Sequence, residues 1–259
     1  MKELNSALEQ GIKDFFLKAG FQKAVIGSSG GIDSALVQTL ASNALGAENV
    51  TAFIMPSEFS SQGSVDDAVA LCNNLGNPFH IIKIAPLYEL YLHTLKEVYG
   101  NTNFDLTEEN LQARIRATLL MAYSNKKHAL LLNTSNKSEL AVGYGTLYGD
   151  LCGAISVIGN LYKTQVYQLA RHLNKDQEII PNHIIQKAPS AELHPGQKDS
   201  DSLPEYAELD KVLVELIDNQ KSVEQVVAQG FSEELVSRIV KLVQRSEFKK
   251  AQVPPILYV

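Results

Sequence analysis

The chain has 259 residues, of which 45% are hydrophobic and 20% are charged, values close to the average for globular proteins. This composition excludes collagen-like, low-complexity and wholly disordered proteins. Lysine and arginine number 23 against 29 acidic residues, which gives a formal net charge of −6 and disfavours a protein that wraps duplex DNA. We therefore expect no nucleic-acid partner, and an anionic ligand must rely on a few placed cations and backbone N–H groups.

The first twenty residues alternate apolar and charged side chains, which predicts an amphipathic helix and not a signal peptide. No apolar run reaches the roughly 18 residues that a membrane span needs, so we expect no membrane partner. The two cysteines, Cys72 and Cys152, fit neither a CxxC pair nor a zinc-ligand spacing. This usage is typical of a reducing compartment, and we expect a cytoplasmic protein.

Short apolar strands alternate with helical patterns through the first two thirds of the chain. Strands are predicted at 23–27, 50–55, 79–84, 129–133 and 156–158, and helices follow them at 64–75, 87–99, from 136, and at 164–173. A helical pattern also follows the first strand directly. This alternation predicts an α/β fold, a doubly wound and mostly parallel sheet flanked by helices, with ligands beyond the carboxyl ends of the strands.

The remaining segments predict helices and one long loop. A helix is predicted at 108–127, and only helices follow at 205–219, 222–228 and 232–246. The stretch 186–203 has prolines, serines and no periodicity, and connections of this length are often lids. We predict a single domain over 1–259, with an α/β core at about 20–180, the lid loop at about 186–203 and a helical part at about 205–250.

A glycine-rich segment lies directly between the first strand and its helix. It consists of Gly27, Ser28, Ser29, Gly30, Gly31, Ile32, Asp33 and Ser34. Glycines allow a turn that exposes successive N–H groups, and the N-terminus of the following helix favours an anion, so the segment suits a phosphate. It lacks the lysine of a Walker A loop and the spacing of GxGxxG. The alternative is a tight turn in which Ser29 or Asp33 caps the helix.

The SGGxDS string in this segment resembles the PP-loop signature of the N-type ATP pyrophosphatases. The stretches at 109–116, 133–139, 143–150 and 189–197 resemble those of ammonia-dependent NAD synthetases, over about Lys23 to Leu209. The resemblance implies an adenine nucleotide alpha hydrolase-like fold. It also implies that ATP, Mg²⁺ and ammonia convert deamido-NAD to NAD through an adenylated carboxylate, in a homodimer with the dinucleotide site at the subunit interface.

The resemblance implies a role for each matching residue. Asp33 and Glu139 match metal-binding carboxylates, and Mg²⁺ is commonly held by one or two carboxylates plus substrate phosphates. Lys163, Thr134 and Ser190 match positions that contact ATP, together with the eight residues of the glycine segment. Each has a plainer alternative, since Glu139 follows Asn136 at capping-box spacing, a lysine is usually a surface residue, and hydroxyls often cap turns.

The resemblance is less complete at the residues that would contact deamido-NAD and ammonia. Arg114 and Lys249 match residues that contact deamido-NAD, and Asp150 matches an aspartate that helps to position ammonia. Arg114 has no acidic partner three or four residues away on its helix and could be a plain surface residue, and Asp150 could belong to an ordinary turn. The chain departs from many relatives at three positions, Leu147, Ala154 and Phe248.

We expect free ammonia as the nitrogen donor, because a fused glutamine-hydrolysing domain needs about two hundred further residues. Two other functions remain open. One is a different enzyme with the same loop, such as a tRNA sulfur-transfer or lysidine-forming enzyme, which should carry a basic RNA-binding extension. The other is a nucleotide-sensing module that binds ATP without turnover.

Overall fold

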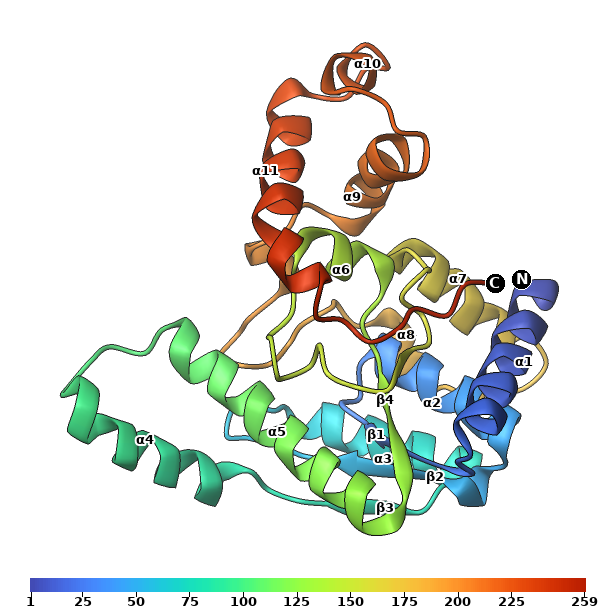
Figure 1. Cartoon of the computed structure of the whole chain (residues 1–259), viewed down its shortest axis with the longest axis vertical. Helices are drawn as coiled ribbons and strands as arrows, with labels where there is room; N and C mark the ends of the chain where they lie inside the picture. Colours follow the sequence, from blue (N-terminus) through green and yellow to red (C-terminus); the bar gives the residue numbers. More distant parts are fainter.

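The computed structural model describes all 259 residues and contains one five-stranded parallel sheet (Figure 1). The strand order is β3-β2-β1-β4-β5. The strands are β1 (Lys23–Gly27), β2 (Val50–Ile54), β3 (Phe79–Ile81), β4 (Ala129–Asn133) and β5 (Ile155–Ser156). The chain first builds outward from β1 to β3 and then returns to add β4 and β5 on the other side. The order therefore changes direction beside β1, where open α/β sheets bind ligands.

Helices cover both faces of the sheet, which confirms the predicted α/β fold. All five residues of β2 are buried, as expected for a strand covered on both sides. Along β1, Ala24 and Ile26 belong to the core under α2 (Ile32–Leu45), whereas Val25 belongs to the core under α5 (Leu106–Lys127). The first of these faces also carries α1 (Lys2–Ala19), α3 (Gln62–Leu75), α7 (Lys163–Leu173) and α8 (Asn182–Gln186).

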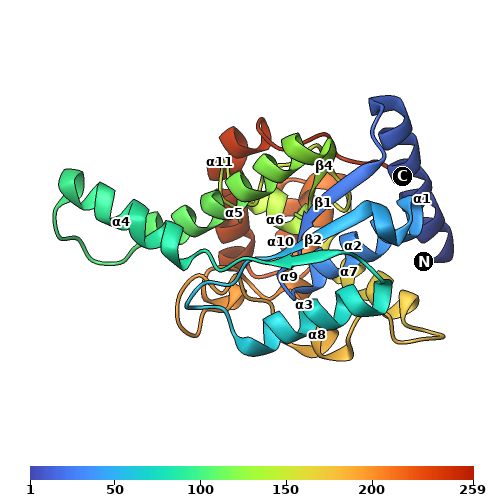
Figure 2. The same cartoon turned by 90° about the horizontal axis from the view of Figure 1, so that it is seen from below.

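The helix α5 and its neighbour α4 (Ala85–Tyr99) extend beyond the sheet as an arm (Figure 2). α5 begins at Leu106, because Asp105 accepts a bond from Thr107 N at 2.7 Å and its own N–H donates to Glu108 at 2.8 Å. This capping box adds two residues to the predicted helix. The lysines at its C-terminal end complement the helix dipole.

Residues 206–250 form a small helical layer beside the sheet (Figure 1). It contains α9 (Tyr206–Leu213), a π-helical turn at Val214–Asp218, α10 (Val223–Val227) and α11 (Glu233–Lys250). These helices bury a core of their own that also takes in Ala141 and Val142 of α6 (Lys137–Val142). The helical part is thus packed directly against the element that follows β4.

One buried carboxylate fastens this layer to the α/β core. Asp210 of α9 accepts hydrogen bonds from the Ser138 hydroxyl of α6 and from Thr164 N of α7, the latter at 2.8 Å. Its side chain is buried. The Ser138 hydroxyl in turn accepts a bond from Lys163 N at 2.9 Å. Three helices therefore meet at Asp210, next to the first residue of α7.

We expect Asp210→Ala to lower the free energy of unfolding by about 2–4 kcal/mol, because a buried N–H and a buried hydroxyl each lose their acceptor. Urea denaturation measures the change. Glu208→Ala on the exposed side of the same helix is the matched control and should shift stability by less than about 0.5 kcal/mol. Equal stability of the Asp210 variant and wild type contradicts the role given to this carboxylate.

The structure differs from the predicted elements mainly at the edges of the sheet. The strand predicted at 79–84 ends at Ile81, and the strand predicted at 156–158 is β5, at Ile155–Ser156. The proline-rich tail lies beside β5, where Ser156 N donates to Pro255 O at 2.9 Å and Leu257 N donates to Ser156 O at 3.1 Å. None of the helices combines the length and apolarity that crossing a bilayer requires.

Candidate active site

The glycine segment forms the turn from β1 into α2 at the carboxyl end of the sheet. Gly30 has a left-handed φ of 73°, and a Cβ at that position would lie 2.2 Å from the backbone oxygen of Ser64. The loop is closed by Gly31 N donating to Ser29 Oγ at 3.2 Å and by Ser29 N donating to Ser34 Oγ at 3.3 Å. The first N–H groups of α2 have no partner within the helix, so they are available to an anion.

This loop opens into a cavity of about 300 Å³, at the lower end of the range typical of ligand sites. Every residue of the predicted segment except Gly30 lines it. The hydroxyl of Ser28 is buried and has no hydrogen-bond partner in the protein.

Lys163 and two carboxylates meet at one side of the cavity. Lys163 Nζ contacts the carboxylate of Asp33 and lies 3.2 Å from that of Glu139. Its side chain is only 3% exposed, so Lys163 is not the surface lysine that the sequence left open as an alternative. Asn136 links the two acids, because its Nδ2 donates to Asp33 at 3.0 Å and its Oδ1 accepts from Glu139 N at 3.0 Å. Glu139 is thus both a capping residue and part of the cluster.

The cluster contains more acids than bases. Besides Asp33 and Glu139, the carboxylate of Asp199 lies nearby, where it accepts a hydrogen bond from the Tyr206 hydroxyl at 2.9 Å. Burial, together with the charges of Asp33 and Asp199, raises the pKa of Glu139 to about 8 against the opposing effect of Lys163. Burial lowers the pKa of Lys163, but Asp33 and Glu139 outweigh that effect and hold it above its ordinary value. The cluster therefore has an excess of acids over bases and is suited to accept a divalent cation.

This imbalance makes the stability of the ligand-free protein depend on pH. Because the folded-state pKa of Glu139 lies near 8 and its ordinary value is 4.5, folding favours the protonated acid. The stability that protonated Glu139 contributes to the folded state is complete below about pH 4.5 and is lost as pH rises through about 8. We expect Glu139→Gln to flatten this part of the profile, measured by urea unfolding at a series of pH values without metal. Parallel profiles of variant and wild type contradict the assignment.

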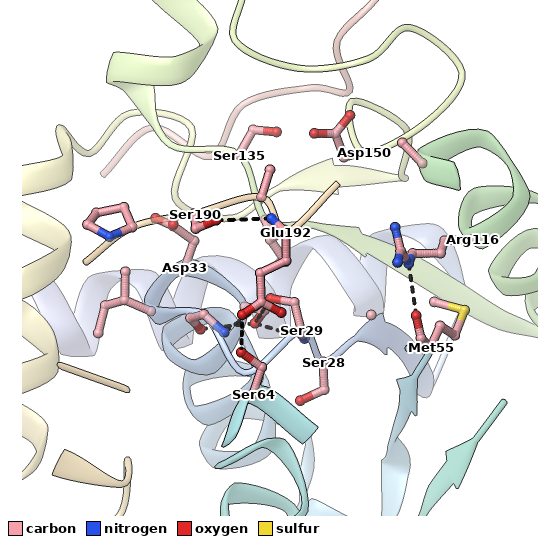
Figure 3. A pocket seen from close by; sticks show the side chains of 18 of the residues that line it. Ser28, Ser29, Asp33, Met55, Ser64, Arg116, Ser135, Asp150, Ser190 and Glu192 are labelled. Carbon is pink, nitrogen blue, oxygen red and sulfur yellow. Dashed lines mark hydrogen bonds between the residues drawn. The ribbon is translucent and has the colours of Figure 1, made fainter. Parts of the chain in front are cut away.

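The opposite side of the cavity combines apolar and charged groups (Figure 3). Apolar side chains of β4, of α5 and of the residue after β2 line it, namely Leu131, Ala113, Ala117, Leu120 and Met55. Arg116 and Asp150 lie on this side, and Arg116 Nε donates to Met55 O at 2.9 Å. The Cys152 thiol also lines the cavity, but burial raises its pKa to about 11, so it is not a ready nucleophile.

The predicted lid loop lies over the cavity, and Lys187–Leu193 contribute to its wall. Glu192 fixes the loop to the start of α3, accepting from Ser61 N at 3.1 Å and from the Ser64 hydroxyl at 2.7 Å. Ser190 lines the cavity, while its hydroxyl donates to Gln197 O at 2.6 Å within the loop. Thr134, at the end of β4, lines the cavity too.

Two predicted binding residues lie outside the cavity wall. Arg114 Nε donates to Leu147 O at 3.2 Å, and Lys249 Nζ donates to Gly143 O at 2.8 Å and to Gly145 O at 2.6 Å. Both side chains therefore hold the 143–150 loop, which carries Asp150. Asn136 and Arg116 were not predicted. The spacing of Asn136 signalled only a cap, and Arg116 looks like any other helical arginine in the sequence.

The sequence matches the model of the NAD synthase family over residues 4–253. The chain belongs to the NAD synthase family. Among curated relatives, it is 50% identical to the glutamine-dependent NAD(+) synthetase of Synechocystis sp., covering 100% of this chain and 46% of that protein. The chain spans about half the length of the curated relatives that it matches.

Two solved structures of the family match along nearly their whole length. One is the NH3-dependent NAD synthetase of Campylobacter jejuni, 33% identical with a TM-score of 0.79, covering 99% of each chain. The other is the NMN synthetase of Francisella tularensis, 31% identical with a TM-score of 0.83, covering 96% of this chain and 95% of that one.

Proposed function

We propose that the chain joins ammonia to the nicotinate carboxylate of deamido-NAD at the expense of ATP, giving NAD, AMP and pyrophosphate. One observation carries this proposal. In a chain of the NAD synthase family, the phosphate-binding loop and the cluster of Lys163, Asp33 and Glu139 face a single cavity at the switch point of the sheet. Membership of this family disfavours the tRNA-modifying alternative.

The chemistry requires activation, because a carboxylate repels nucleophiles and has no adequate leaving group. A carboxylate oxygen forms a bond to the α-phosphorus of ATP, and the bond from that phosphorus to the bridging oxygen breaks, so pyrophosphate leaves with the electron pair. Ammonia then forms the C–N bond, and AMP departs with the carboxylate oxygen. Holding both substrates in one cavity removes much of the entropic barrier.

We assign the phosphate side of the cavity to the leaving group. The N–H groups of the loop and the ammonium of Lys163 stabilise the charge that builds on pyrophosphate. Asp33 and Glu139 would hold Mg²⁺, which supplies positive charge to the phosphates when bound. Asp150, on the opposite side, would position ammonia, and the 186–203 loop would keep water from the adenylate.

We propose ammonia as the nitrogen donor and a homodimer as the working form, in the cytoplasm. The likeness to an NH3-dependent synthetase along 99% of both chains supports ammonia. The arm supports pairing, because its apolar side chains are exposed, including Leu87, Leu90, Tyr91, Val98 and Tyr99. Arg114 and Lys249, outside the cavity wall, would contact deamido-NAD at that interface. Light scattering after gel filtration tests the dimer.

The nicotinate mononucleotide is a second candidate for the substrate that accepts ammonia, and a separate assay tests it. The relative named NMN synthetase has the same fold at a TM-score of 0.83. The nicotinate mononucleotide carries the same carboxylate, so the adenylation chemistry is unchanged and only the acceptor differs. A ratio of kcat/KM that favours the mononucleotide assigns the chain to that reaction.

The test incubates the protein with ATP, Mg²⁺, an ammonium salt and deamido-NAD, and follows NAD, AMP and pyrophosphate. We expect equal amounts of the three products, and Asp33→Asn should lower their rate by ~10²-fold. Asp176→Asn, an exposed aspartate, is the matched control. Tight ATP binding without pyrophosphate release supports the nucleotide-sensing alternative, and formation of ADP and phosphate excludes the proposed route.

A further inference from the structure

Arg116 is a cation of the cavity that has no acidic partner. It appears in none of the protein's eight ion pairs. Its one hydrogen bond within the protein runs from Nε to Met55 O, which leaves both terminal nitrogens of the guanidinium without a protein acceptor. Burial lowers the pKa of Arg116 to about 10, so the group is still charged at neutral pH.

The acids closest to Arg116 are engaged elsewhere. Asp150 and Glu192 act on its charge, but neither lies within ion-pair distance. The carboxylate of Asp150 accepts from Thr146 N at 2.6 Å, and that of Glu192 binds Ser61 and Ser64. A half-buried cation without an acidic partner is unfavourable. Its place in a ligand-sized cavity therefore indicates that an anionic ligand supplies the missing charge.

The position of Arg116 identifies which part of a nucleotide it can meet. Its helix also contributes Ala113 and Ala117 to the apolar side of the cavity, whose surface suits a purine ring. Figure 3 shows Arg116 beside Met55 on one side of the cavity and Asp33 on the other, with Ser28 and Ser29 between them. In ATP, the ribose and the α-phosphate join the purine to the two outer phosphates.

We propose that Arg116 binds the α-phosphate of ATP, whereas Lys163 serves the two outer phosphates. This inference rests on the proposed function only in taking ATP as a substrate. The planar fork of the guanidinium suits a phosphate with two free oxygens. Arg116 would reduce the repulsion between the attacking carboxylate and the α-phosphate, and it would remain bound to AMP after pyrophosphate has left.

The experiment measures the binding of AMP, adenosine and inorganic pyrophosphate by competition with a fluorescent ATP analogue, without any acceptor. Arg116→Gln should weaken AMP binding ~10- to 100-fold and leave adenosine and pyrophosphate unchanged. Arg116→Lys, which keeps the charge, should recover most of the AMP affinity. Lys163→Ala should show the opposite pattern, with weaker pyrophosphate and unchanged AMP. Arg245→Gln, on the exposed side of α11, is the matched control.

Thermal unfolding separates this role from a structural one. Because Arg116 is unpaired in the ligand-free protein, Arg116→Gln should melt at or above the temperature of wild type. An equal loss of AMP and adenosine affinity, a clear fall in melting temperature, or AMP binding unchanged in both variants overturns the proposal. Wild type that binds AMP but forms no NAD contradicts the proposed function alone, and the role of Arg116 is still decided by the binding data.

Discussion

Lys163→Met is expected to destabilise the protein and to suppress turnover together. The substitution removes the one cation that contacts Asp33 and Glu139, so two acids are left facing each other in a mostly buried site. Breaking such a pair by removing one partner costs about 3–5 kcal/mol. Loss of a placed charge at the leaving group lowers the rate of pyrophosphate release by ~10²- to 10³-fold. Urea unfolding and a pyrophosphate assay measure the two effects.

The control for Lys163 is Lys137→Met, which breaks a 2.6 Å ion pair with Asp218 at the surface. The Asp218 side chain is 39% exposed, so this pair contributes less than about 1 kcal/mol. In the double variant Lys163→Met/Glu139→Gln, part of the lost stability should return, because the second change removes an unpaired acid. A Lys163 variant with the stability and turnover of wild type contradicts the cluster described above.

Gly30→Ala is expected to abolish most ATP binding while the protein remains folded. Alanine in the left-handed conformation costs about 1–2 kcal/mol. The new Cβ also meets the Ser64 oxygen at 2.2 Å, so the loop must move. A displacement of about 1 Å in a positioned site costs ~10²-fold in rate. Calorimetric titration with ATP and the pyrophosphate assay measure the outcome.

A matched glycine separates the clash from the backbone strain. Gly20 ends α1 with a φ of 75°, nearly that of Gly30, but a Cβ there has no neighbour within 4 Å. Gly20→Ala should therefore lose about 1–2 kcal/mol of stability and keep full ATP affinity. If both alanine variants bind ATP as wild type does, the close approach of the glycine loop to α3 has no role in nucleotide binding.

The fold was predictable because its signals are local. The strand of Lys23–Gly27 and the helix after Gly31 are set by an apolar run, glycines and an apolar helical face, all within about twenty residues. The pairing of the tail with Ser156 was not predictable, since it joins residues about one hundred positions apart through backbone bonds. Local patterns contain no information on such a contact.

The candidate site was predictable in part for the same reason. The glycine segment is recognisable from its composition and its position, and Glu139 follows Asn136 at a recognisable spacing. The contact of Lys163 with Asp33 joins α7 to α2 across 130 positions. Arg114 and Arg116 both lie on α5, but their side chains point in different directions. The side chain of Arg116 points toward the cavity, and that of Arg114 points toward Leu147. That direction depends on packing, which the sequence pattern does not specify.

The central claim is that this cavity brings the α-phosphorus of ATP to the acceptor carboxylate. The most direct measurement uses deamido-NAD labelled with oxygen-18 in the nicotinate carboxylate, followed by mass spectrometry of the products. The account predicts that one labelled oxygen appears in the phosphate of AMP and that pyrophosphate contains none. Unlabelled AMP, or label in inorganic phosphate released beside ADP, contradicts it.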